Sequence, residues 1–281
     1  MKRILIRISK IVGVLILIVY VSACALFYFN QEKFGFRPDK LSPDYIYDYT
    51  GNFQEVNLKT ADGININNLL FKADSSKGVI LYLHGNGCSL SDIGKHAEFY
   101  TSLGYDVFMA DYRGYGKSEG SINSEPQLHQ DNQMIYDELK KTYSEDKIIV
   151  IGYSLGGALA TKLASNNNPR YLVLHAPFCG TKGYNAWPDE EPPLIMKMFS
   201  LMPMKLLLKY TLKTNEFIQN CNMPILIFHG TEDNVIPIGS SIKLKEDFKS
   251  EDRLIVLEGE DHLDIGNNPD YQMEIQKLLG N

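Results

Sequence analysis

Cysteine is scarce in this sequence, and the spacing of its cysteines excludes two common uses of the residue. The chain of 281 residues has four, Cys24, Cys88, Cys179 and Cys221, without a C-x-x-C pair or a histidine-rich metal spacing. Because Cys24 lies in an apolar run, an odd number remains for the rest of a long chain, which does not indicate a disulfide scaffold. The redox compartment, and the redox state of the other three cysteines, stay open.

Excess positive charge is missing from the body of the chain. The formal net charge is −6, and the first thirty residues hold four basic residues and no acidic one. The remainder therefore carries −10, whereas a protein that binds nucleic acid presents a basic face. We therefore expect no nucleic-acid partner. Internal repeats and low-complexity tracts are also absent from the sequence.

The N-terminus contains an apolar segment of membrane length. Residues 1–29 combine a basic stretch with Ile11–Phe29, nineteen residues without a charge. A helix of that length spans about 28 Å, close to the hydrocarbon core of a bilayer. The run ends in aromatic residues, which favour interface depth. We expect an uncleaved single-pass anchor, with the basic N-terminus in the cytoplasm and the body on the non-cytoplasmic side.

Two other interpretations of this segment stay open. Val21-Ser-Ala-Cys24 resembles a bacterial lipoprotein-processing box, in which Cys24 would become the lipidated first residue. Against it, the chain remains apolar beyond the cysteine as far as Phe29. A cleaved signal peptide would have a shorter apolar region and a small-residue cleavage site. The anchor and the lipoprotein interpretation both make a membrane the partner of this protein.

Beyond a linker expected over residues 30–50, short apolar strands alternate with helices across residues 51–281. Thr60-Ala-Asp-Gly63 predicts a hairpin turn between the first two strands. The expected strands span 53–58, 64–71, 79–83, 106–110, 148–151, 171–174, 224–228 and 254–257. The expected helices span 91–103 with Ser91 as N-cap, 125–142, 157–164 and 269–279. This alternation predicts an α/β fold with a mostly parallel sheet of about eight strands and helices on both faces.

One segment interrupts the alternation between two sheet strands. Residues 180–221 carry four prolines and four methionines in an apolar background. Because the segment lies between strands, it must be an excursion over the strand ends, and a methionine-rich surface adapts to varied ligands. We expect a short helical cap that lines an acyl pocket and that could also touch the membrane through its lysines. An ordinary packing helix is the alternative.

The strongest chemical signal lies in residues 147–157. Ile148–Ile151 predicts a buried strand, which leads into Gly-Tyr-Ser-Leu-Gly and then a run of strong helix formers. A serine on a sharp strand-to-helix turn is the nucleophile-elbow arrangement. We expect glycines at 152 and 156 because a side chain there would collide with the neighbouring strand or helix. Ser154 is the candidate nucleophile, with a helix N-cap serine as the alternative.

A serine hydroxyl needs a base that takes its proton and a third group that holds the base. In this architecture such groups collect at the carboxyl ends of parallel strands. His262 lies in a loop after the last strand, from which it can reach Ser154, so it is the candidate base; a surface histidine among acids is the alternative. The other five histidines fall in predicted helices or directly end strands: His84, His96, His129, His175 and His229.

The orienting carboxylate can come from the loop after the penultimate strand. Asp233 precedes a stretch closed by Pro237, which fixes a loop that can aim one carboxylate. Three other carboxylates compete with Asp233 by sequence alone: Glu232, Asp261 and Asp264.

An acyl-transfer site also needs two N–H donors for the developing oxyanion. Leu155 follows the nucleophile and supplies one of them. The second is expected from the turn after the third strand, where Gly85 lets the backbone approach closely and the Asn86 N–H is the candidate donor. A simple glycine-rich turn is the alternative.

Five motifs, taken in order, resemble the α/β-hydrolase superfamily. They are L-Y-L-H-G-N-G, D-Y-R-G-Y-G-K-S-E-G, G-Y-S-L-G-G, F-H-G-T-E-D-N-V-I-P and E-D-H. More narrowly, they are similar to its small-capped, membrane-anchored serine hydrolases, a group with acyl-protein thioesterase-like and lysophospholipid-hydrolase-like members. Residues 29–41 resemble the segment that follows the anchor in that group. The resemblance covers nearly the whole chain.

The resemblance implies roles for particular residues. The order Ser, Asp, His that these hydrolases use implies Ser154 as nucleophile, Asp233 as orienting acid and His262 as base, without a cofactor. It also implies that residues 111–120 form a structural turn, with Arg113 tied into the scaffold. Cys88 is a departure, because the group commonly has a small or polar residue after H-G-N-G, and it leaves the size of that part of the pocket open.

We therefore expect a membrane-tethered serine hydrolase that cleaves a carboxylic ester or thioester of a small or lipid-like acyl substrate. A peptidase or amidase on the same fold is the alternative, although a compact cap favours esters. Intact triad positions and elbow glycines argue against a non-catalytic scaffold. A metal-dependent hydrolase built on His84, Asp111 and His229 has no supporting spacing such as H-E-x-x-H. The physiological substrate and the oligomeric state are not indicated.

Overall fold

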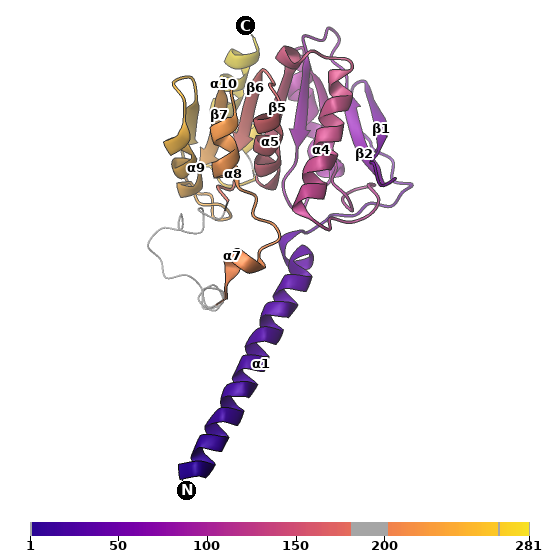
Figure 1. Cartoon of the computed structure of the whole chain (residues 1–281). Helices are drawn as coiled ribbons and strands as arrows, with labels where there is room; N and C mark the ends of the chain where they lie inside the picture. Colours follow the sequence, from indigo (N-terminus) through magenta and orange to yellow (C-terminus); the bar gives the residue numbers. More distant parts are fainter. Residues whose placement is uncertain (1, 181–201, 264, 281) are drawn as a thin grey trace. The chain divides into compact units, whose positions relative to one another are not determined.

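The computed structural model of the chain describes residues 2–180, 202–263 and 265–280, which belong to two compact units. The smaller unit comprises Met1–Phe36 with Glu191–Tyr210, and the larger comprises Arg37–Glu190 with Thr211–Asn281. Figure 1 colours the chain along its sequence, so that the segments of each unit can be followed.

The smaller unit is built on one long helix. α1 runs over Lys2–Gly35, is long and apolar enough to cross a membrane, and leaves most of its apolar side chains exposed. It continues beyond residue 29 because the polar residues that follow include Gln, Glu and Lys, which are good helix formers. The first residues of the predicted linker are therefore helical. The unit also contains the short helix α7, Met204–Leu207.

The larger unit is organised around one eight-stranded sheet, in the order β1-β2-β4-β3-β5-β6-β7-β8. β2 is antiparallel to β1 and β4, and the other neighbouring pairs are parallel. The strands are β1 Phe53–Lys59, β2 Asn65–Phe71, β3 Val79–Leu83, β4 Asp106–Ala110, β5 Ile148–Tyr153, β6 Tyr171–His175, β7 Ile225–Gly230 and β8 Arg253–Leu257. The predicted α/β class and mostly parallel sheet are confirmed.

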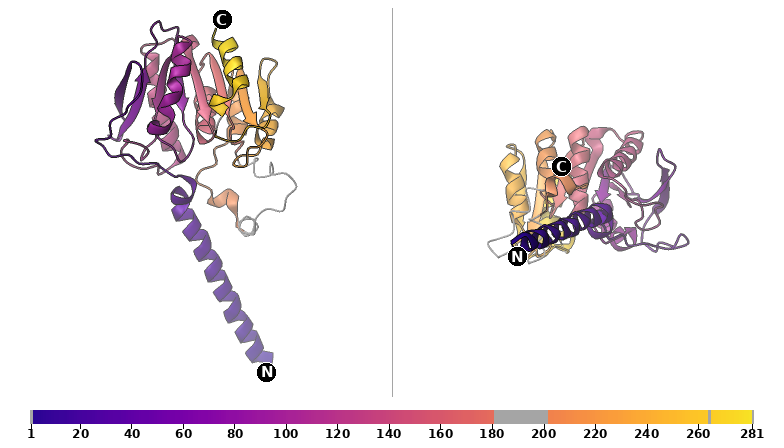
Figure 2. Two further views of the ribbon diagram at one scale, coloured as in Figure 1. Left: turned by 180° about the vertical axis from the view of Figure 1, so that it is seen from behind. Right: turned by 60° about the horizontal axis from the view of Figure 1, so that its bottom comes forward.

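Helices cover both faces of this sheet. α4 and α5 lie over the face turned to the viewer in Figure 1, and the view from behind in Figure 2 shows α10 over the other face. The helices are α2 Leu90–Ile93, α3 Ala97–Ser102, α4 Glu125–Lys140, α5 Leu155–Asn166, α8 Thr214–Phe217, α9 Gly239–Leu244 and α10 Pro269–Leu279. Short 3₁₀ turns span Gly94–His96, Glu145–Lys147, Ile218–Asn220, Lys245–Asp247 and Ile265–Asn267.

The helix predicted over 91–103 is divided, and the predicted N-cap is wrong. The cap is Ser89, whose N–H donates to the Asp92 carboxylate at 2.9 Å, so that Ser91 lies inside the first turn. Gly94 then opens a 3₁₀ turn between α2 and α3. A side chain at Gly94 would come within 2.3 Å of the Tyr49 ring, so the position requires the glycine that weakens the helix.

The predicted cap over 180–221 lies largely outside the described residues, which omit 181–201. Its two ends in the larger unit lie together, because the Asn215 N–H donates to the Cys179 carbonyl at 3.2 Å. Near its C-terminal end, the Glu125 carboxylate accepts hydrogen bonds from the N–H groups of Thr211 and Leu212. The residues on either side of the predicted cap therefore lie close together in the larger unit. In the sequence they fall between β6 and β7.

Candidate active site

Ser154 occupies a strained turn between β5 and α5. Its φ of 53° and ψ of −113° fall in a region that residues other than glycine rarely adopt. Glycines on either side make the turn possible. A methyl group added at Gly152 would lie 2.4 Å from the Gly156 carbonyl oxygen. A methyl group added at Gly156 would lie 2.1 Å from the Leu83 carbonyl oxygen. The predicted need for both glycines is confirmed.

The structure brings the three predicted triad residues together. His262 Nε2 lies 3.1 Å from Ser154 Oγ, and His262 Nδ1 lies 2.6 Å from Asp233 Oδ2. All three side chains are buried. With Asp233 ionised, Nδ1 carries the proton and Nε2 accepts the hydrogen bond from the serine hydroxyl. The arrangement can therefore take a proton from Ser154 and hold the resulting imidazolium.

Asp233 is built to remain ionised. Its Oδ1 accepts hydrogen bonds from the N–H groups of Val235 at 2.9 Å and Ile236 at 2.7 Å. Burial raises the pKa of this carboxyl, but hydrogen bonds from His229 and His262 outweigh burial, so that the pKa lies well below its usual range. A fixed negative charge therefore faces the Nδ1 side of His262.

The competing carboxylates do not occupy this position. Glu232 is exposed, and Asp261 is an exposed residue whose Oδ1 accepts from the Leu263 N–H at 2.7 Å. Asp264 lies outside the described residues. Of the carboxylates weighed from the sequence, Asp233 is the one seen in contact with the His262 ring.

His229 supports Asp233, a role that the sequence did not reveal. Its Nε2 donates to the Ile236 carbonyl at 2.7 Å and lies 3.2 Å from Asp233 Oδ2, while Nδ1 lies 2.6 Å from Ser241 Oγ. The ring thus holds both the carboxylate and the turn that carries it. The spacing His-x-x-x-Asp at a strand end was the available signal, but it becomes meaningful only when the turn folds back.

Tyr153 connects three parts of the site. Its hydroxyl donates to the His262 carbonyl at 3.0 Å, and its ring centroid lies 5.2 Å from that of His262. On the other side, a methyl group at Gly85 would lie 2.8 Å from the Tyr153 ring and 3.4 Å from Ser154 Cβ. The turn after β3 therefore passes directly beside Ser154, the place in which the sequence predicts an oxyanion donor.

The Asn86 side chain secures this turn. Its Oδ1 accepts hydrogen bonds from the Arg37 N–H at 2.8 Å and from the Tyr115 hydroxyl at 2.7 Å. These two bonds fix the peptide that carries the Asn86 N–H, the predicted second oxyanion donor. Leu155, the other predicted donor, is the first residue of α5, where backbone N–H groups have no partner within the helix.

A buried pair lies behind the same turn. His84 Nε2 is 3.2 Å from Asp111 Oδ1, and the His84 carbonyl accepts from the Tyr112 hydroxyl at 2.7 Å. Burial alone would lower the pKa of His84, but the neighbouring Asp111 carboxyl and Cys88 thiol raise it to about 10. A methyl group at Gly116 would lie 1.9 Å from Asp111 Oδ2. The pair is therefore buried and closely packed next to the turn that begins at Gly85.

The three residues weighed for a metal-dependent hydrolase, His84, Asp111 and His229, make separate contacts. His84 pairs with Asp111, whereas His229 contacts Ser241 and the Asp233 turn. Among the residues that the structure describes, no group of three or more histidine, cysteine, aspartate or glutamate side chains is arranged to hold a metal ion.

Two expectations drawn from the resemblance can be compared with the structure. Arg113 is tied into the scaffold as expected, because its guanidinium contacts Asp131 and also donates to both carboxylate oxygens of Asp62 at 2.7 Å. Cys88, the departure from the group, is half-buried, and its thiol lies 3.3 Å from the Gly85 carbonyl. Cys88 thus contacts the turn that carries the predicted oxyanion donor.

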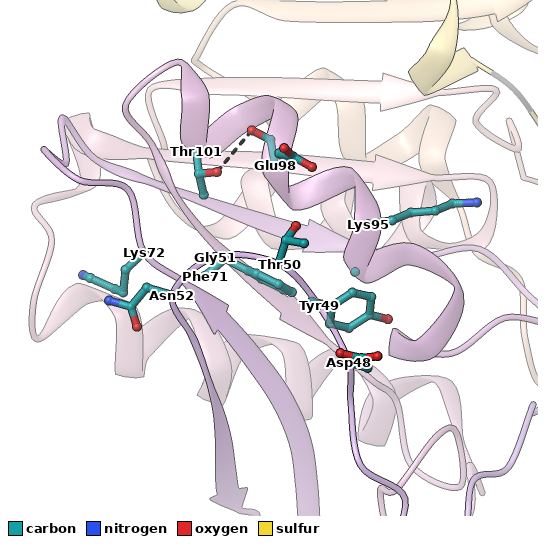
Figure 3. Close-up of a pocket in the computed structure, with 11 residues that line it drawn as sticks. Asp48, Tyr49, Thr50, Gly51, Asn52, Phe71, Lys72, Lys95, Glu98 and Thr101 are labelled. Atoms are coloured by element: carbon teal, nitrogen blue, oxygen red, sulfur yellow. Dashed lines mark hydrogen bonds between the residues drawn. The ribbon is translucent and has the colours of Figure 1, made fainter.

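A pocket lies in the larger unit, between the segment Asp48–Asn52 and the α2–α3 region (Figure 3). Lys72 and Lys95 lie on opposite sides of it, and Lys72 already pairs with Asp106. The hydrogen bond drawn in Figure 3 joins Thr101 to the Glu98 carbonyl at 3.1 Å within α3. None of the triad residues lines this pocket, and its charged groups do not converge on one point.

Similarity to known proteins agrees with this geometry. Residues 74–216, just over half of the chain, match the Hydrolase_4 family model, described as serine aminopeptidase, S33. The mouse alpha/beta hydrolase domain-containing protein 17C is 28% identical over 213 residues, which are 74% of this chain and 61% of that protein. Protein 17B of Xenopus laevis is 29% identical over 212 residues, 73% of this chain and 67% of that protein. The chain spans about three fifths of the length of the 17C relatives.

Solved structures share the fold. An esterase of Pyrococcus furiosus superposes with a TM-score of 0.65 at 20% identity, covering 87% of this chain and 96% of that one. An alpha-beta hydrolase of Vibrio vulnificus superposes with a TM-score of 0.64 at 23% identity, covering 82% of each chain. At these identities the likeness is one of fold. The family match shows that the chain belongs to the serine aminopeptidase S33 (Hydrolase_4) family, and the shared fold is that of the α/β-hydrolase superfamily.

Proposed function

We propose that this protein hydrolyses a carboxylic ester or thioester through an acyl-enzyme on Ser154. The observation that carries the proposal is the continuous hydrogen-bonded series from Ser154 Oγ through His262 to Asp233, with contacts of 3.1 and 2.6 Å. Such a series supplies a nucleophile, a general base and a group that holds the base in the productive tautomer.

In the proposed reaction, His262 Nε2 carries one proton in each half. It takes the proton of the Ser154 hydroxyl as Oγ attacks the acyl carbon, and the imidazolium then gives that proton to the leaving oxygen or sulfur. Water enters next, loses a proton to Nε2 and attacks the acyl carbon of the acyl-enzyme; the imidazolium then returns this second proton to Ser154 Oγ, which releases the acid and restores the serine. Asp233 stays ionised throughout and stabilises the imidazolium.

The N–H groups of Leu155 and Asn86 are the proposed oxyanion donors. Two observations support them: Leu155 begins α5 directly after the nucleophile, and the turn at Gly85 passes beside Ser154. Donors that are already in place cost no reorganisation when charge develops, and one such donor contributes about 10²–10³-fold to turnover in other serine hydrolases.

A peptidase or aminopeptidase activity is the second candidate. The specific observation in its favour is the description of the matching family model, which names a serine aminopeptidase. The same nucleophile and base can cleave amides, but an amide nitrogen leaves less readily than an ester oxygen or a thioester sulfur. For this chain we place esters and thioesters of a small or lipid-like acyl group first.

We further propose that α1 is a single-pass membrane anchor. Its length, its apolar composition and its exposed side chains support this role. The basic residues before the apolar run favour an N-terminus in the cytoplasm and a hydrolase unit on the non-cytoplasmic side. Lipidation at Cys24 after cleavage is the alternative, and the intact mass of the purified membrane form distinguishes the two.

An ester, a thioester and an amide of one acyl group test the proposed reaction class. We expect the purified full chain in detergent to give the higher kcat/KM values on the ester and thioester, and Ser154→Ala to reduce turnover of both to background. A preference for the amide would instead establish the peptidase activity. A folded wild-type protein that turned over none of the three, across a series of acyl lengths, would contradict both activities and favour a non-catalytic scaffold.

A further inference from the structure

The polar end of α1 binds the last residue of α7 and the segment that follows it. The Gln31 side chain is buried and makes two hydrogen bonds with backbone groups of this segment. Its Nε2 donates to the Leu207 carbonyl at 2.7 Å, and its Oε1 accepts from the Lys209 N–H at 2.9 Å. The Gln31 side-chain amide thus pairs with one backbone carbonyl and one backbone N–H group of this segment. A neighbouring β-strand would satisfy such backbone groups in the same way.

Side chains on both sides of Gln31 extend this contact. Glu32 Oε1 accepts from Lys209 Nζ at 2.9 Å and from the Tyr210 hydroxyl at 3.0 Å. The Lys209 ammonium also lies 4.9 Å from the centre of the Tyr28 ring, and the Tyr210 ring meets Phe36 edge-on at 4.9 Å. Residues 204–210 are therefore bound along the last turns of α1, as Figure 1 shows for α7 beside this helix.

This contact sets the depth of residues 204–210 relative to the apolar run. Gln31 is two residues beyond Phe29, where the uncharged run ends, and two residues correspond to about 3 Å of helix rise. The Leu207 carbonyl that Gln31 binds therefore lies within several Å of the end of the run. Headgroup regions add roughly 5–8 Å on each side of the hydrocarbon core, so this segment falls at interface depth.

Two large apolar side chains at this level are exposed. Leu206 is 82% exposed and Phe34 is 68% exposed within the described residues. The aromatic and lysine side chains around them, Tyr28, Tyr210 and Lys209, are types that membrane interfaces favour. Phe29, the last residue of the apolar run of α1, is likewise 73% exposed.

We propose that the end of α1 and residues 204–210 form one surface that lies in the headgroup region of a lipid bilayer, with Leu206 and Phe34 in contact with lipid. The proposal rests on the anchor role of α1. It goes further, because it assigns a second segment to the membrane and identifies the Gln31 and Glu32 contacts as what holds it there. Acyl chains presented by a bilayer would then meet the protein at the C-terminal end of the cap excursion.

Tryptophan reporters in phosphatidylcholine vesicles test this surface. Trp187→Phe removes the only tryptophan of the full chain, and Leu206→Trp or Val19→Trp then introduces a single reporter. Phosphatidylcholines brominated near the headgroup or deep in the chains report depth by quenching. We expect Val19→Trp, which lies near the middle of the apolar run, to be quenched mainly by deep bromines, and Leu206→Trp mainly by shallow ones, with a blue-shifted emission.

A double variant tests the role of the contact. In the Leu206→Trp protein, Gln31→Ala with Glu32→Ala should remove most of the shallow quenching, whereas Asn30→Ala should leave it unchanged, because the Asn30 amide bonds the Leu26 carbonyl of the same helix. A quenched Val19→Trp with an unquenched Leu206→Trp would overturn this inference and leave the anchor intact. An unquenched Val19→Trp would overturn the anchor and this inference together. Hydrolysis in detergent reports separately on the proposed reaction.

Discussion

Single residues around Ser154 act through loops that are distant in the sequence. His262 reaches the serine from the loop after β8, and the same residue offers its backbone carbonyl to the Tyr153 hydroxyl at 3.0 Å. Tyr153 precedes Ser154, so one hydroxyl links the loop that carries the proposed base to the strained turn. We regard Tyr153 as a positioning residue, because its hydroxyl and ring contact His262 and its ring lies against the Gly85 turn.

Tyr153→Phe removes this link and keeps the ring. One hydrogen bond contributes roughly 1 kcal/mol, which corresponds to about a five-fold change in rate. We expect kcat to fall by about that factor with KM unchanged, because the hydroxyl bonds the protein and not the substrate. Steady-state kinetics on the best ester, beside Tyr136→Phe, tests the effect. Tyr136 is a buried tyrosine whose hydroxyl bonds Glu145 in another part of the unit. A rise in KM at constant kcat would contradict the positioning role.

At the scale of elements, the site depends on close contact between β3 and α5. The start of α5 approaches the end of β3 so closely that Gly156 has no room for a methyl group. This contact brings the turn after β3 to Ser154, which directly precedes α5. The two proposed oxyanion donors come from these two elements, so their separation is set by the packing of a strand end on a helix start.

Gly156→Ala should destabilise the larger unit. The added methyl group would lie 2.1 Å from the Leu83 carbonyl oxygen, so the helix or the strand must shift. Overpacking of this kind costs roughly 1–3 kcal/mol, which a urea denaturation midpoint resolves. Gly266→Ala is the matched control, since its methyl group would have its nearest neighbour at 3.5 Å, an ordinary contact. Equal midpoints for the two variants would show that the contact is less tight than described.

Much of this element-level arrangement could be predicted from the sequence. The sequence predicted the first and last residues of β3 (Val79–Leu83) and β4 (Asp106–Ala110) correctly. Buried parallel strands are continuous apolar runs flanked by polar residues or glycine, which marks their ends. The division of the helix at Gly94 could not be predicted, because its cause is Tyr49, which lies far away in the sequence. The supporting role of His229 was missed for the same reason: it depends on the folded turn at Asp233.

At the scale of the whole molecule, the buried histidines make stability depend on pH. Burial, with a smaller contribution from His96, lowers the pKa of His175 to about 3. The ring packs against Phe228 and Tyr271 at centroid distances of 6.1 and 4.7 Å. Between about pH 3 and the ordinary histidine pKa of about 6.5, the unfolded state binds a proton at His175 that the native state does not bind.

The sign of this dependence follows from the proton binding. The unfolded state takes up a proton near pH 6.5, whereas native His175 resists protonation down to about pH 3. The contribution of neutral His175 to the free energy of unfolding is therefore complete above about pH 6.5 and is lost as the pH falls toward 3. We expect His175→Phe to make the decline of the urea midpoint over this interval shallower. An unchanged slope would contradict the burial of a neutral imidazole.

The central claim is that Ser154 is a nucleophile activated by His262 and Asp233. Labelling of the purified full chain with a fluorophosphonate probe tests it most directly, because the probe reacts with a serine that has its base and oxyanion donors in place. We expect the wild type to be labelled, Ser154→Ala to be unlabelled, and Asp233→Asn to be labelled far more slowly, since its carboxamide no longer holds His262 in the productive tautomer. A folded wild type that stays unlabelled in detergent and in liposomes, or a Ser154→Ala variant labelled as fast as wild type, would contradict the claim.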